Sequence, residues 1–222
     1  MTETLHIEGL TVRHGAVVAV REASLSAPAS AITALVGVNG AGKSSLIRAV
    51  IGLAVSDGII RLGEHVISGL PVEARIHAGL GYVPEGRRVF PGMTVEENLL
   101  VAGPAGSQLR RRRRDAALDL FPQLEPRLAD RAWKLSGGQQ QMLAISRALM
   151  ADPAVYMLDE PTLGLAPQVI DDVAASLRRL ADKGAAILLA EQNVGFAARV
   201  ADSMITIDTG RIAPAPATSE PD

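Results

Sequence analysis

The sequence predicts an α/β fold in which a parallel sheet is covered by helices. Short apolar runs at 31–36, 154–158, 185–190 and 203–208 have the length and composition of buried strands. The first two runs are followed by turn residues and then by stretches with helical periodicity, as in β–α–β units. Residues 94–150 are more polar and helical throughout, so we interpret them as a helical insertion in the α/β core.

The N-terminal third contains predicted elements before and after the first buried strand in the sequence. Residues 3–27 contain three short β-type runs, and residues 45–53 follow the strand with a helical pattern. A Ser-Asp-Gly turn then leads into a strand-like segment at 59–67. Residues 71–79 predict a short helix, and residues 81–83 end a further strand candidate.

Two of the expected helices carry a complete N-terminal capping signal. Thr94 and Glu97 have the spacing of a capping box, in which two side chains bond each other's backbone amides. Ser136 and Gln139 repeat this spacing at a second helix. The helix expected at 167–183 begins with proline, has one apolar face and is followed by glycine.

Composition excludes several classes of protein. The 222 residues are 48% hydrophobic, enough for one substantial core, and a net charge of −2 argues against general affinity for nucleic acid. The lack of cysteine excludes disulfides and thiolate metal sites. The N-terminus lacks the features of a signal peptide, and no apolar run approaches the ~18 residues of a membrane span. We therefore expect a cytoplasmic chain that reaches a membrane only through a partner.

A glycine-rich loop between the first buried strand and its helix predicts a phosphate-binding site. GVNGAGKS at 37–44 fits the pattern G-x-x-x-x-G-K-[ST], whose backbone amides surround phosphate oxygens. Lys43 would reach the β- and γ-phosphates, and Ser44 would bind Mg²⁺. The alternative is a glycine-rich turn with an incidental lysine. The candidate nucleotide-binding residues of this segment are Gly37, Asn39, Gly40, Ala41, Gly42, Lys43, Ser44 and Ser45.

Two adjacent carboxylates follow the apolar run at 154–158. Asp159, at the end of the strand, can hold Mg²⁺ directly or through water. Glu160 can face the γ-phosphate and take a proton from the attacking water. The alternative is that both carboxylates belong to a helix N-terminus. The phosphate-binding loop elsewhere in the chain favours the catalytic interpretation.

LSGGQQQ at 135–141 predicts a second helix end that can bind an anion. Ser136 caps the helix, and Gly137 and Gly138 leave its first amides accessible. Because one triphosphate rarely needs two such helix ends, the second one would serve a nucleotide on another subunit. An ordinary capped helix is the alternative for this segment taken alone.

Taken in order, GVNGAGKS, LSGGQQQ and VYMLDEP resemble the nucleotide-binding subunit of an ABC transporter, and the resemblance covers about 4–212. It implies a single domain, 1–212, with a RecA-like P-loop NTPase core, an antiparallel β subdomain and a helical subdomain at about 86–150. It also implies ATP and Mg²⁺ held head-to-tail between two such subunits, the second being a paralogue or a copy of this chain. His14 matches the position whose side chain stacks on adenine. Its alternative is an ordinary surface position on a strand.

The resemblance further implies partners and a place in the cell. Two membrane-spanning permease subunits would bind the ATPase dimer at the cytoplasmic face of the inner or plasma membrane. A solute-binding protein would act indirectly, and no nucleic acid would be involved.

One segment resembles a particular branch of this family. PEGRRVFPGMTVEENL is similar to the second ATP-binding subunit of branched-chain amino-acid importers, as are residues 120–127, 161–167 and 190–193. Gln192 stands where most relatives have a switch histidine. We expect its amide to donate a hydrogen bond to a γ-phosphate oxygen, without transferring protons.

Glu85 occupies a position that is normally glutamine and that contacts Mg²⁺ and the attacking water in this family. A carboxylate there is attracted by the metal but repelled by the triphosphate. We therefore expect Glu85 beside the metal site without direct coordination. Arg87, Arg88 and Phe90 are expected on the side that faces the membrane partner.

Two other segments stand outside the motifs. The five arginines at 110–114 favour a solvated helix face, and contact with anionic lipid headgroups is the alternative. The C-terminal residues 213–222 are rich in proline, alanine and acid, so we expect disorder in place of a final strand and helix.

Together these features predict an ATPase subunit of an ABC importer for branched-chain amino acids. Alternatives are a subunit for urea, amides or lipopolysaccharide, a non-transport ABC ATPase, and a nucleotide-binding regulator without turnover.

Overall fold

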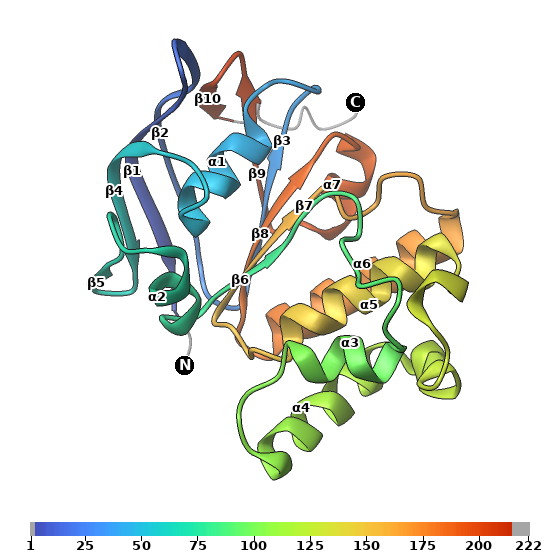
Figure 1. Cartoon of the computed structure of the whole chain (residues 1–222). Coiled ribbons are helices and arrows are strands. Elements are labelled where there is room, and N and C mark those ends of the chain that lie inside the picture. Colours follow the sequence, from blue (N-terminus) through green and yellow to red (C-terminus); the bar gives the residue numbers. More distant parts are fainter. Residues whose placement is uncertain (1–2, 215–222) are drawn as a thin grey trace.

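A computed structural model describes residues 3–214, and its main sheet is parallel apart from one edge strand (Figure 1). The strand order is β10-β9-β3-β8-β7-β6. In that order the strands are Arg211–Pro214, Ser203–Asp208, Ile32–Val36, Ala186–Glu191, Val155–Asp159 and Leu80–Val83. The apolar runs predicted as strands therefore pair with one another. Their carboxyl ends meet at one edge, where the loops of interest begin.

The second sheet is antiparallel and has the order β2-β1-β4-β5. Its strands are Val17–Ala27, Leu5–His14, Ser56–Leu62 and His65–Val66. Two of the predicted runs merge into β1, which passes Gly9 with a positive φ and an irregular register. The single strand expected at 59–67 is instead a hairpin, because Gly63 adopts a left-handed turn between β4 and β5. The Ser-Asp-Gly segment lies inside β4 and not in a turn.

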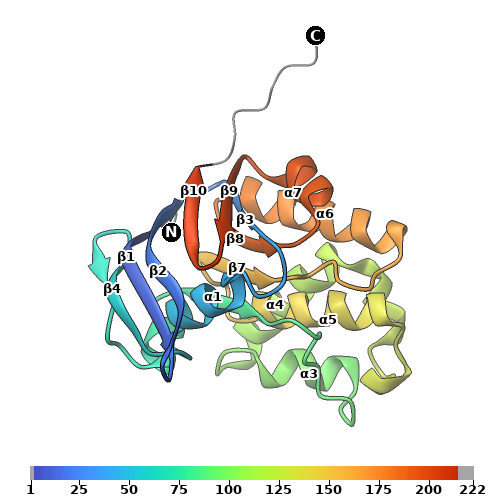
Figure 2. The same cartoon turned by 90° about the horizontal axis from the view of Figure 1, so that it is seen from above.

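Helix α1, Lys43–Ile51, lies between the two sheets, as Figure 2 shows from above. Its apolar side chains join one face of the main sheet and the inner face of the antiparallel sheet in one buried cluster. The short helix α2, Val72–His77, lies at the end of α1. This arrangement holds the loop before α1 against the end of β3.

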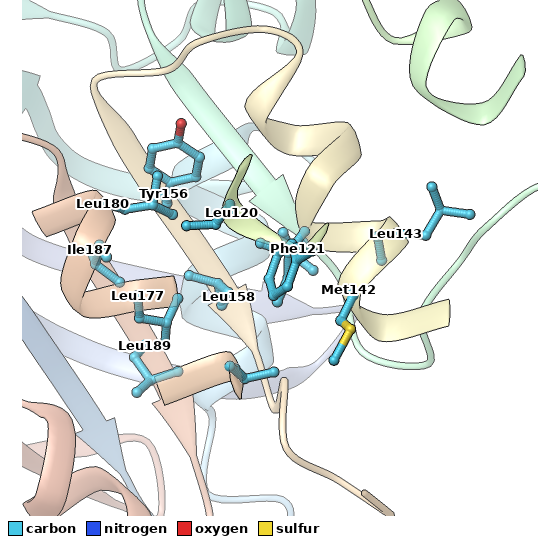
Figure 3. Close-up of a cluster of buried hydrophobic side chains, with 14 of the residues drawn as sticks. Leu120, Phe121, Met142, Leu143, Tyr156, Leu158, Leu177, Leu180, Ile187 and Leu189 are labelled. Atoms are coloured by element: carbon cyan, nitrogen blue, oxygen red, sulfur yellow. The ribbon is translucent and has the colours of Figure 1, made fainter. Parts of the chain in front are cut away.

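The other face of the main sheet is covered by α5 (Gly137–Leu149), α6 (Pro167–Asp182) and α7 (Val194–Val200). Helices α3 (Val95–Val101) and α4 (Ser107–Leu120) pack against α5, and short 3₁₀ turns lie at Pro122–Arg127 and Ala132–Lys134. In Figure 3, Phe121 points into a cluster with Met142 of α5 and Leu158 of β7. The sequence patterns did not predict α7. It is only seven residues long and contains a glycine, so it has little periodicity to detect.

Both predicted capping boxes are present. The Thr94 hydroxyl accepts from the Glu97 amide at 3.0 Å, and the Glu97 carboxylate accepts from the Thr94 amide at 2.7 Å. The corresponding distances at Ser136 and Gln139 are 3.3 and 3.1 Å. These bonds fix the residues at which α3 and α5 begin. In α5 they also fix the position of the first turn, which contains Gly137.

The arginine run lies on α4, where several of its members have specific partners. Arg110 donates to the Pro104 carbonyl, Arg113 donates to the Met150 carbonyl, and Arg114 pairs with Glu96. Arg111 and Arg112 are exposed. The expectation of a solvated helix face therefore holds for Arg111 and Arg112, whereas the other three arginines are partly buried.

The C-terminal boundary differs from the expected one. Arg211–Pro214 form β10, which pairs with β9, so residues 213 and 214 belong to a strand and the expectation of disorder from residue 213 was wrong for these two residues. The pattern was obscured because the strand is four residues long and ends in Ala-Pro, residues that are depleted in strands. Residues 215–222, the rest of the predicted disordered tail, lie outside the described residues.

Arg75 of α2 links this helix to the end of α1. Its side chain is buried and donates to the carbonyls of Ala49, Val50 and Leu70, each at 2.8 Å. Burial lowers the pKa of the guanidinium. Because the Ala49 and Val50 carbonyls lie in the last turn of α1, Arg75 bonds to them and complements the negative end of the helix dipole.

We expect Arg75→Met to destabilise the fold by about 1–3 kcal/mol, because it removes the guanidinium donor from the buried Ala49 and Val50 carbonyls. Urea unfolding measures the loss. Arg61→Met is the matched control, since Arg61 forms an exposed pair with Glu8 that contributes little. Equal stability of the two variants would contradict this role for Arg75.

Candidate nucleotide-binding site

A pocket of about 300 Å³ opens at the carboxyl edge of the main sheet. It is lined by the loop before α1 together with Glu85 and Glu160, so segments far apart in the sequence meet there. A larger cavity of about 610 Å³ contains Arg112, Lys183 and Tyr156, but no glycine-rich loop lines it. The chemistry therefore favours the smaller pocket as the phosphate site.

The phosphate-binding loop is shaped by close contacts with its neighbours. A Cβ on Gly37 would lie 2.4 Å from the Ile207 carbonyl oxygen, so no other residue fits there. Gly42 has a φ of 113° and begins α1 without any side-chain cap. The first amides of α1 are therefore available to an anion, which the helix dipole also favours.

Lys43 lies folded over this loop. It is 4% exposed, and its Nζ donates to the carbonyls of Gly37 at 2.7 Å and Val38 at 3.1 Å. It also pairs with a Glu160 carboxylate oxygen at 3.1 Å. The ammonium group is thus placed inside the loop, where phosphate oxygens would compete for it with Glu160.

Ser44 and Asp159 lie together as the sequence predicts. The Ser44 hydroxyl donates to Asp159 Oδ1 at 2.8 Å, whereas Oδ2 is buried without a hydrogen-bond partner in the described part of the chain. Burial raises the pKa of the Asp159 carboxyl, and the charges of Glu85 and Glu160 raise it further. An orphaned buried oxygen in a cluster of negative charge fits Mg²⁺, which commonly takes one or two carboxylates plus phosphate oxygens.

Glu160 leaves the sheet directly after β7. Its backbone has a φ of 47°, and its amide donates to the Ala190 carbonyl at 2.9 Å. This left-handed conformation costs roughly 1–2 kcal/mol for a residue with a side chain. The turn places the carboxylate in the pocket beside Lys43, whereas the Asp159 side chain stays buried. The two adjacent carboxylates therefore occupy different environments.

The sequence patterns missed a third carboxylate, Glu191, at the end of β8. It is 2% exposed and accepts from the Thr162 hydroxyl at 2.6 Å and from the Asn193 amide at 3.3 Å. Burial raises the pKa of its carboxyl. Glu191 thereby ties the loop after β7 to the loop after β8. The available signal was its position at the end of an apolar run, which matches that of Asp159 in the neighbouring strand.

Other predicted site residues lie around the pocket. Glu85 is exposed and lines it, and the exposed His14 is 3.0 Å from the Ser45 hydroxyl through Nε2. Gln192 lines a neighbouring pocket of about 360 Å³ that shares Glu160 with the first. The roles assigned to these three side chains remain predictions.

Ser136, Gly137 and Gly138 do not line the phosphate pocket. They form the first turn of α5, where a Cβ on Gly138 would lie 2.6 Å from a methyl group of Val169. Gly138 therefore allows α5 to pass close to α6. The predicted anion-binding turn of α5 is separate from the chain's own phosphate loop.

The sequence profile of the ABC transporter family matches residues 20–163, from the antiparallel sheet through both carboxylates. The chain belongs to the ABC transporter family. As an ABC transporter ATP-binding chain it is an ATPase, and the family membership confirms ATP as its nucleotide. The resemblance stated from the three motifs is thus confirmed.

Two curated relatives of this ABC ATPase match most of its length. It is 39% identical over 210 residues to the high-affinity branched-chain amino acid transport ATP-binding protein BraG of Pseudomonas aeruginosa, spanning 94% of this chain and 90% of that protein. It is 41% identical over 187 residues to the probable branched-chain amino acid transport ATP-binding protein LivF of Archaeoglobus fulgidus, spanning 83% and 79%.

Solved structures confirm the predicted fold class of this ABC ATPase. A nucleotide-free ATP-binding cassette from an ABC transporter aligns with a TM-score of 0.87 at 25% identity, over 95% of this chain and 89% of that one. A cassette in its ADP conformation aligns with the same TM-score and identity, over 96% and 90%. Within residues 3–214, no helix combines the length and apolarity that crossing a membrane requires.

Proposed function

We propose that this chain is the ATP-hydrolysing subunit of an importer for branched-chain amino acids. Its relatives BraG and LivF carry that function in their names. Two ATPase subunits would bind ATP head-to-tail and drive two membrane-spanning permease subunits. A solute-binding protein would deliver the amino acid on the other side of the membrane, which places this chain at the cytoplasmic face.

The observation that carries the proposal is the separation of two anion-binding elements. Lys43 and Ser44 line one pocket, and Ser44 is hydrogen-bonded to the buried Asp159, whereas the first turn of α5 lies outside that pocket. A helix N-terminus with two glycines is suited to phosphate. In a head-to-tail dimer, Ser136, Gly137 and Gly138 of one subunit would complete the nucleotide site of the other.

The contacts of Lys43 with Glu160 and of Ser44 with Asp159 support specific roles in ATP binding. Lys43 exchanges its bond with Glu160 for phosphate oxygens, which frees the Glu160 carboxylate to accept a proton from water. Ser44 and Asp159 would hold Mg²⁺, and the ion supplies charge that offsets the triphosphate when it is bound. We assign Gln192 to γ-phosphate sensing, Glu85 to the surroundings of the metal and His14 to adenine stacking.

The test is to purify the chain with its permease subunits in lipid and measure ATP hydrolysis with added solute-binding proteins. We expect leucine-loaded binding protein to stimulate turnover, while the same protein without leucine does not. Urea- or amide-loaded binding proteins are the controls for solute class. Stimulation by one of these in place of the leucine-loaded protein would overturn the assigned substrate but leave the ATPase assignment intact.

A further inference from the structure

Arg87 lies where its own loop meets the first turn of α5 and the loop after β7. Its guanidinium lies against Gly137, so that a Cβ on this glycine would lie 2.7 Å from Nη1 and 2.9 Å from Nη2. The same Nη2 would be 3.9 Å from a Cβ on Gly164, in the loop after β7. Arg87 therefore lies between the first turn of α5 and the loop that follows Glu160. That Arg87 also faces the membrane partner stays a prediction.

The position of this guanidinium is electrostatically unusual. The N-terminus of a helix carries partial positive charge, so a cation is disfavoured at the first turn of α5. No carboxylate among the described residues lies within 4 Å of the Arg87 guanidinium. An anion placed there would interact favourably with both the amides of α5 and the guanidinium.

The surrounding structure holds Arg87 in this position. Arg87 and Arg88 have φ angles of 66° and 44°, so both residues adopt left-handed backbone conformations. Arg147 of α5 donates to the Arg88 carbonyl at 2.6 Å, and its guanidinium lies 4.4 Å from the centre of the Phe90 ring. Burial lowers the pKa of Arg147. These contacts fasten the loop to α5, so that its conformation follows that helix.

We propose that Arg87 is a nucleotide-binding residue that contacts the terminal phosphates of the ATP held by the partner subunit. The inference rests on the proposed head-to-tail dimer, in which the first turn of α5 faces that triphosphate. Arg87 supplies a charged, bidentate donor that the backbone amides of α5 lack. Glu85, two residues earlier, lines the chain's own phosphate pocket. The segment 85–87 thus reaches from one nucleotide site toward the other.

The test compares Arg87→Gln, Arg87→Lys and Arg88→Gln, each in a Glu160→Gln chain with ATP and Mg²⁺. Arg88 is the matched control because it is adjacent, exposed and also left-handed. Sedimentation measures the dimer dissociation constant, and a fluorescent ATP analogue measures binding to the monomer. We expect Arg87→Gln to weaken dimerisation at least ~10-fold, with a smaller loss for Arg87→Lys and none for Arg88→Gln. The affinity of the monomer for the analogue should change less than about 2-fold, because Arg87 does not line the chain's own phosphate pocket.

The other outcomes would overturn either this inference or the proposed function. Unchanged dimerisation of Arg87→Gln would overturn the inference, and so would a loss accompanied by a lower unfolding temperature or weaker monomer binding. If the Glu160→Gln parent itself fails to dimerise with ATP, the proposed function fails instead. The two failures are therefore distinguishable.

Discussion

Replacing Glu160 with glutamine is expected to lower ATP turnover at least ~100-fold, because the amide cannot accept the proton of the attacking water. Nucleotide binding should be retained. Lys43 keeps its bonds to the Gly37 and Val38 carbonyls, and one negative charge near the triphosphate is removed. The variant should therefore accumulate as an ATP-bound dimer, which light scattering with and without ATP detects.

Glu73→Gln is the control for Glu160→Gln, since Glu73 is an exposed carboxylate on α2. It should leave turnover and dimerisation at the parental level. Parental turnover in Glu160→Gln would show that another group takes the proton. Buried Glu191 would then be the first alternative to examine, because it lines the pocket next to Glu160.

Replacing Lys43 with methionine is expected to weaken ATP binding by ~10–100-fold, the equivalent of losing charged hydrogen bonds worth about 1.5–3 kcal/mol. Calorimetry with ATP and Mg²⁺ measures the effect. Lys183→Met is the control, because that lysine is exposed and does not line the phosphate pocket. ATP affinity equal to that of the control would contradict the assigned contact.

Lys43→Met should also destabilise the free chain. The side chains of Lys43 and Glu160 are only 4% and 9% exposed, so removal of the lysine leaves a nearly buried carboxylate without its partner. The double variant Lys43→Met, Glu160→Gln should recover part of the lost stability in urea unfolding. No recovery would mean that Lys43 stabilises the chain only through the Gly37 and Val38 carbonyls.

Local patterns were sufficient for the features that depend on neighbouring residues. The capping boxes at Thr94 and Ser136 use side chains three residues apart, so sequence spacing alone predicts them. The phosphate loop was also predictable, because its glycines, lysine and serine are contiguous. Two short local features were not predicted from the sequence. The Gly63 hairpin and the helix α7 are too short for a periodic pattern to be measured.

The sequence by itself determined the family, the phosphate-binding loop and the carboxylates at the strand ends, because those motifs are short and each has its own local chemistry. Only the tertiary structure showed that Lys43 pairs with Glu160, that Glu191 joins two loops and that Arg87 lies against Gly137. These contacts join segments that are distant in the sequence. The order of strands in the sheet and the packing of α5 bring them together, and no local periodicity encodes either.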